Sequence, residues 1–146
     1  MAQTCTYLNF ERNTEEAFNF YKTVFGGDFM DGKINRFRDV PAQEGMQPIA
    51  EADKDLVMHV ALPIHGGHLL MGTDAPKSMG FTVNKGNNVH ILLYTDSRSQ
   101  ADTLFGKLSS GGNADMPLQD MFWGDYYGTL TDKFGIKWMI TYHQVN

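Results

Sequence analysis

The sequence predicts a mixed fold of helices and strands, in which a strand, a helix and three further strands follow one another twice. Short runs of alternating apolar and polar residues indicate strands, and two longer segments with apolar residues three and four positions apart indicate amphipathic helices. A shift of 84 residues, the distance from Ala17 to Ala101, superposes the two helices, since Val24 then meets Leu108. The matching order of elements around both helices indicates an internal repeat of two modules.

The first module, about residues 1–74, begins with a strand and a helix. The helix is expected to begin near Asn13 or Thr14, either of which can cap its first turn, and a Gly-Gly pair ends it. Its apolar face is expected to consist of Ala17, Phe20, Tyr21, Val24 and Phe25. The elements expected in this module are a helix over 12–27, strands over 5–10, 28–37, 56–64 and 67–74, and a polar loop over 38–55.

The second module, about residues 88–146, follows a linker over 75–87 that is rich in glycine and asparagine. The elements expected there are a helix over 96–112 and strands over 88–95, 114–122, 126–132 and 136–143. Asp96 or Ser97 can cap the helix. Pro117 cannot donate a backbone hydrogen bond, so its strand is expected at a sheet edge or interrupted.

The composition predicts a single domain of 146 residues in a reducing compartment. Cys5 is the only cysteine, so no disulfide can form within the chain, and we expect a cytoplasmic protein. The sequence shows no basic start followed by an apolar run, and no apolar stretch approaches the ~20 residues of a membrane span. A net charge of −5 repels nucleic acid on average. We therefore expect neither a membrane nor nucleic acid as a partner.

Two long segments carry a resemblance to a known family. The segment "YLNFERNTEEAFNFYKTVFGG" resembles the opening motif of the PhnB-like branch of the vicinal oxygen chelate superfamily, the glyoxalase, bleomycin-resistance and extradiol dioxygenase group. The segment "MPLQDMFWGDYYGTLTDKFGIKWMITY" resembles its closing motif. The resemblance implies an α+β fold in which the two strand–helix–three-strand modules form a cup-shaped mixed sheet with the helices outside. It also implies a small-molecule ligand in a sheet-lined cleft, and a homodimer.

The resemblance further implies four metal-ligand positions, on the first and last strand of each module. Relatives fill them with His and Glu, because Zn, Ni or Fe prefers imidazole and carboxylate donors. This sequence places there, in chain order, Cys5 or Thr6, Met71, His90 and Met139. Thioethers supply no negative charge, so we expect the usual divalent metal to be absent and no other cofactor. A displaced metal site formed by His59, His90 and an acid such as Asp74 is the alternative.

The candidate ligand-binding residues are His59, Met71, His90, Tyr94, Trp123 and Met139. Trp123 lies in a glycine-flanked loop, where with Tyr126 and Tyr127 it could form an aromatic lid over a flat ligand. His90 is also the candidate catalytic residue, because imidazole changes charge near neutral pH and can act as a general base.

The sequence therefore predicts one of two functions. The first is binding or sequestration of a small molecule in a sheet-lined cleft without the usual metal, which the methionine and aromatic residues at the ligand positions favour. The alternative is a glyoxalase-type lyase or isomerase that uses either a divalent metal or His90 as a general base.

Overall fold

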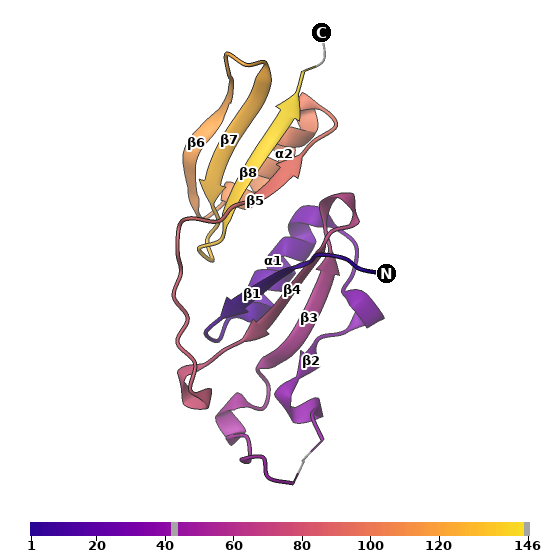
Figure 1. The fold of residues 1–146 in the computed structure, drawn as a ribbon, viewed down its shortest axis with the longest axis vertical. Coiled ribbons are helices and arrows are strands. Elements are labelled where there is room, and N and C mark those ends of the chain that lie inside the picture. The colour runs from indigo at the N-terminus through magenta and orange to yellow at the C-terminus, as the bar shows by residue number, and fades with distance from the viewer. Residues whose placement is uncertain (42–43, 145–146) are drawn as a thin grey trace. The chain divides into compact units, whose positions relative to one another are not determined.

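The chain forms two compact units in the computed structural model, which describes residues 1–41 and 44–144 (Figure 1). Unit 1 is Met1–Val83 and unit 2 is Asn84–Asn146. The boundary between them lies inside the linker predicted over 75–87. Neither α-helix of the described residues has the length and apolar character needed to cross a membrane.

Unit 1 contains one helix and one four-stranded sheet, which we call sheet 1. Its elements are β1 (Thr6–Phe10), α1 (Thr14–Phe25), β2 (Asn35–Arg36), β3 (Val57–Pro63) and β4 (Leu69–Asp74). The strand order is β1-β4-β3-β2, with β1 parallel to β4 and the other neighbours antiparallel. Sheet 1 is therefore mixed, as predicted.

Unit 2 repeats this arrangement in sheet 2. Its elements are β5 (Ile91–Tyr94), α2 (Arg98–Ser109), β6 (Asn113–Asp120), β7 (Asp125–Thr131) and β8 (Lys137–His143). The strand order is β5-β8-β7-β6, again with one parallel and two antiparallel pairs. The α+β fold class and the repeated strand–helix–three-strand module are thus confirmed. The strand with Pro117, β6, lies at the sheet edge, also as predicted.

Each helix packs on one face of the sheet in its own unit. In α1, Ala17, Tyr21 and Val24 are buried as expected, whereas Phe20 and Phe25 are only half-buried. The sequence interpretation missed Phe18, which is fully buried. Its ring lies above Gly72 of β4, where the absence of a side chain leaves room for it.

The first turn of α1 is capped by a residue distant in sequence. Asn13 makes no side-chain cap, and the buried carboxylate of Asp74 at the end of β4 accepts hydrogen bonds from the Thr14 amide at 3.0 Å and the Thr14 hydroxyl at 2.8 Å. Its second oxygen accepts from the Val57 amide at 2.8 Å. Asp74 therefore joins α1, β3 and β4. Helix α2 is capped instead by the residue directly before it, because the Ser97 hydroxyl accepts a hydrogen bond from the Gln100 amide.

Two predicted strands are shorter than expected. The segment 28–37 was expected to be a strand, but only Asn35–Arg36 pairs with β3. Residues Met30–Gly32 form a 3₁₀ turn in which Asp31 has a φ of 60°, a conformation that ends extended pairing. The strand expected over 88–95 begins only at Ile91, which pairs with Trp138 near the start of β8. His90 therefore lies one residue before the strand.

The closing motif forms the tight turn between β7 and β8. The buried carboxylate of Asp132 accepts hydrogen bonds from the Phe134 and Ile136 amides at 2.8 and 3.0 Å and from the Trp138 indole at 2.9 Å. Gly135 provides the positive φ that the turn requires. This part of the motif thus fixes a hairpin and the largest core side chain.

Candidate functional site

The face of each sheet that points away from its helix, here called the far face, carries most of the predicted site residues. In β1, Leu8 and Phe10 are buried, whereas Tyr7 alternates with them and is 46% exposed. In β5, Leu93 is buried, and its neighbours Leu92 and Tyr94 are 44% and 65% exposed. Alternation along the strands therefore separates a helix-covered face from a far face in both units.

The far face of sheet 1 brings together His59 and Met71. Met71 is paired with Tyr7 of β1 and with Ala61 of β3. The Tyr7 hydroxyl lies 3.2 Å from His59 Nδ1, and their rings are 5.8 Å apart. Burial raises the pKa of Tyr7, against a smaller lowering from its hydrogen bond with Thr73. This face therefore combines an imidazole, a phenol and a thioether.

The far face of sheet 2 brings together Tyr94 and Met139. Met139 is paired with Leu92 and with Thr129, and Tyr94 is paired with Thr141. Thr141 is 3% exposed, and its hydroxyl has no hydrogen-bond partner among the described residues. A buried hydroxyl without a partner is uncommon in native structures, and burial also closes this hydroxyl to a ligand on the far face.

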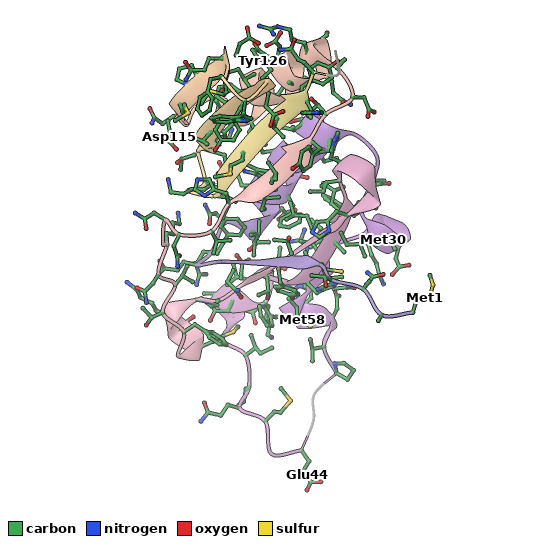
Figure 2. All side chains as sticks on the ribbon, turned by 45° about the horizontal axis from the view of Figure 1, so that its top comes forward. Met1, Met30, Glu44, Met58, Asp115 and Tyr126 are labelled. Atoms are coloured by element: carbon green, nitrogen blue, oxygen red, sulfur yellow. The ribbon has the colours of Figure 1, made fainter. Side chains whose placement is uncertain are left out.

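Trp123 lies between β6 and β7, next to the far face of sheet 2. Its ring is 6.2 Å from the ring of Tyr127 and 5.0 Å from that of Phe122, which is 97% exposed. The expectation that Tyr126 joins this group is wrong. Tyr126, labelled in Figure 2, points to the helix-covered face, where the Arg98 guanidinium lies 3.8 Å from its ring centre.

His90 is half-buried, and no hydrogen bond orients its ring among the described residues. The displaced metal site is contradicted at Asp74, whose carboxylate is bound by backbone and hydroxyl donors at the start of α1 and β3. Asp74 alternates with Thr73, so it points to the face opposite His59. It therefore cannot serve as a metal ligand beside His59.

The residues at the inherited ligand positions do not fit the usual divalent metal. In unit 1, Thr6 points to the face opposite Met71 and bonds His68 at 2.8 Å, and Cys5 precedes β1. In unit 2 the positions hold His90 and Met139. Neither unit has a carboxylate at these positions, and thioethers are poor donors for Zn, Ni or Fe(II). Among the described residues, no three His, Cys, Asp or Glu side chains gather as a metal site would require.

Two residues that the sequence interpretation missed, Asp125 and His143, face each other at one end of sheet 2. They are paired across β7 and β8, and His143 Nδ1 lies 2.6 Å from Asp125 Oδ1. The sequence could have predicted this pair from the hairpin turn at residues 132–135. An antiparallel pairing around that turn places residue 125 opposite residue 143.

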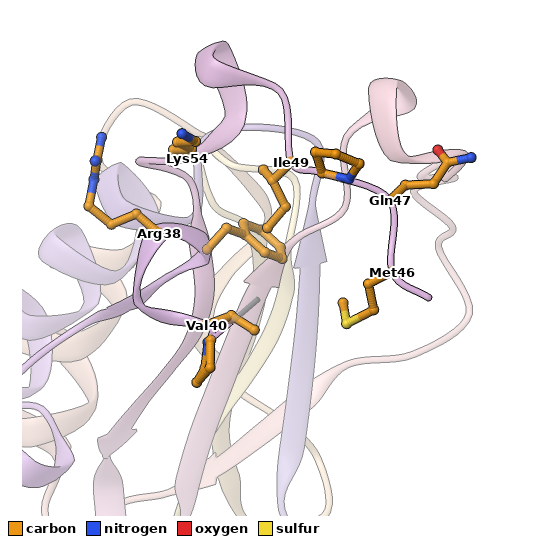
Figure 3. Close-up of a pocket in the computed structure, with 9 residues that line it drawn as sticks. Arg38, Val40, Met46, Gln47, Ile49 and Lys54 are labelled. Carbon is orange, nitrogen blue, oxygen red and sulfur yellow. The ribbon is translucent and has the colours of Figure 1, made fainter. Parts of the chain in front are cut away.

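Two overlapping cavities of about 440 and 380 Å³ lie in unit 1, along the loop after β2, and Figure 3 shows the smaller one. The larger is lined mainly by apolar side chains, among them Phe37, Ile49, Met58 and Met79. Its polar wall is Asp53, whose pKa is lowered by hydrogen bonds from Ser78 at 2.7 Å and Arg12 at 2.9 Å. None of the predicted site residues lines either cavity.

Comparisons with known proteins agree with this architecture. A family model described as Glyoxalase/Bleomycin resistance protein/Dioxygenase superfamily matches residues 8–140. Protein YjdN from Escherichia coli (strain K12) is 28% identical over 143 residues, which cover 92% of this chain and 90% of YjdN. Protein PA1353 from Pseudomonas aeruginosa superposes with a TM-score of 0.82 at 32% identity, covering 99% of this chain and 100% of that structure. The PhnB protein from Bacillus cereus superposes with a TM-score of 0.71 at 26% identity, covering 97% and 99% of the two chains.

Proposed function

The chain belongs to the Glyoxalase/Bleomycin resistance protein/Dioxygenase superfamily, and from this premise we propose that it binds a small molecule on the far face of one of its sheets without the divalent metal usual in that superfamily. One observation carries the proposal. The far faces hold Met71 and Met139 at positions where a metal-dependent relative would present carboxylates, and the exposed side chains of Tyr7, Leu92 and Tyr94 share these faces. Apolar lining with a few polar groups is typical of ligand sites.

The polar groups on these faces would orient the ligand. His59 and Tyr7 already form a hydrogen-bonded pair, so a ligand carbonyl or hydroxyl can be added to an existing network. Such groups contribute specificity, whereas contact with the aromatic and thioether side chains of the same face contributes most of the affinity.

The alternative function, a metal-dependent lyase or isomerase, is disfavoured by the same residues. Met71 and Met139 supply neither the charge nor the hard oxygen donors that the metal would require. The homodimer expected from the resemblance stays a prediction, which sedimentation of the full chain would measure.

Binding of the flat, uncharged dye Nile red tests the proposal. We expect the dye to bind and to raise the melting temperature of the protein once the dye's concentration exceeds the Kd. At a dye concentration one hundred times the Kd, binding should add about 2.7 kcal/mol to the free energy of unfolding. The matched sample is the same protein dialysed against EDTA, which should bind equally well because no metal takes part. Loss of binding after EDTA and its recovery with zinc would contradict the proposal and favour the metal-dependent alternative.

A further inference from the structure

Three side chains at one end of sheet 2, those of Trp123, Asp125 and His143, form a connected hydrogen-bonded group. Asp125 Oδ1 accepts from His143 Nδ1 at 2.6 Å, and Asp125 Oδ2 accepts from the Trp123 indole N–H at 3.0 Å. Both carboxylate oxygens are therefore engaged, which fixes the carboxylate in position. The Asp125 side chain is 23% exposed, and the His143 side chain is 66% exposed.

This group defines the tautomer of His143. An ionised carboxylate can only accept hydrogen bonds, so the proton on Nδ1 must be donated to Asp125. In the neutral ring, Nε2 then carries the lone pair, and the exposed side chain makes that nitrogen accessible to another molecule. A ring nitrogen presented in this way, with its partner nitrogen held by a carboxylate, is the arrangement of an oriented general base.

The surroundings of the base suit a flat molecule. Residues two positions apart in a strand point to the same face. Asp125 and Tyr127 in β7, and Thr141 and His143 in β8, therefore all lie on the far face. The Tyr127 ring also lies near that of Trp123. Thr141 is two residues from His143 on the same strand, about 7 Å along it. The Thr141 hydroxyl is buried, so a small planar molecule held against Tyr127 can reach Nε2 of His143 but not that hydroxyl.

We propose that His143, oriented by Asp125, is a general base that removes a proton from a small, flat, conjugated molecule held against Trp123 and Tyr127. In this step the C–H or O–H bond of the substrate breaks, an N–H bond forms at His143 Nε2, and the electron pair stays in the conjugated system. Return of the same proton to another atom of the substrate regenerates the base, so the overall reaction is an isomerisation that needs no co-reactant. This inference goes beyond the proposed binding function by adding a chemical step.

The elimination of nitrobenzisoxazole tests the proposal, because this planar probe requires only a base. The base removes the proton from the isoxazole carbon, the electron pair forms a nitrile, and the N–O bond breaks to release a coloured phenolate. We expect the full chain to catalyse this reaction and His143→Ala to lose about 100-fold in rate, with the same loss in His143→Gln. Asp125→Asn should lose about tenfold, and nitrogen NMR should show that His143 then populates both tautomers.

His65→Ala is the matched control, because His65 lies in a turn of unit 1 and its loss should leave the rate unchanged. A wild-type rate no higher than that of free imidazole at equal concentration would overturn the proposal. So would a full rate in His143→Ala, or a loss of rate in His90→Ala alone. Normal binding of Nile red without elimination would overturn the base assignment and leave the binding function standing, whereas elimination without Nile red binding would contradict only the binding function.

Discussion

Asp132→Asn is expected to lower the free energy of unfolding by about 3 kcal/mol, because a buried carboxylate that accepts from two amides and an indole loses an acceptor atom. The new amide nitrogen would face either an N–H of the turn or that of Trp138, so one buried donor is left without a partner. Trp138 is fully buried, and its neighbours cannot admit water without opening the core. Chemical denaturation monitored by tryptophan fluorescence measures the loss.

Asp96→Asn is the matched control for this prediction. Asp96 belongs to the same unit and is exposed, so its substitution should change the free energy of unfolding by less than about 0.5 kcal/mol. Equal stability of Asp132→Asn and Asp96→Asn would show that the turn does not depend on the carboxylate. That result would also contradict the view that the closing motif fixes the β7–β8 hairpin through Asp132.

Gly72→Ala is expected to destabilise the chain by about 3 kcal/mol, although alanine is otherwise favoured over glycine. The added methyl group would lie 2.5 Å from Phe18 Cε2, 2.9 Å from Cζ and 3.1 Å from Thr14 Cγ2. Phe18 is 0% exposed, so its ring cannot move aside without displacing α1. Thermal or chemical unfolding of the variant measures the effect.

Gly106→Ala supplies the control with the opposite sign. Gly106 lies in α2 with no atom near its added methyl group, so alanine should stabilise the helix by about 0.5–1 kcal/mol. Phe18→Leu combined with Gly72→Ala should recover part of the lost stability, because the smaller side chain makes room. No recovery in the double variant would mean that the cost arises elsewhere than in this contact.

The sequence predicted both helices, the order of the elements along the chain in each module, and that β6 would be an edge or interrupted strand, because periodicity and single residues such as Pro117 carry that information locally. It overestimated the strand over 28–37, because the turn around Asp31 depends on one left-handed residue that pattern does not reveal. The cap of α1 was also missed. Asp74 reaches Thr14 across the fold, and no local rule connects residues 60 positions apart.

The candidate residues of the site stay predictions, and the structure adds how their strands pair. The pairing of strands in the structure places Tyr94 and Met139 on one far face and His59 and Met71 on the other, whereas alternation gives only which residues of a single strand share a face. The sequence pattern could not show which histidine is oriented by a carboxylate, because that depends on which residue of the neighbouring strand lies opposite the histidine. The register of β7 against β8 places Asp125 opposite His143, whereas His90 precedes its strand. Register, more than residue type, therefore distinguishes the two histidines.

The affinity for Nile red in two double variants tests the central claim, that the ligand binds on the far face of one of the sheets. Tyr7→Ala with Tyr94→Ala removes one exposed aromatic side chain from each far face, and we expect binding to weaken about tenfold. Phe81→Ala with Met79→Ala removes an exposed aromatic of the linker and a wall of the larger loop cavity, and we expect wild-type affinity. Unchanged affinity in the first variant and weakened affinity in the second would place the ligand in the loop cavity and contradict the claim.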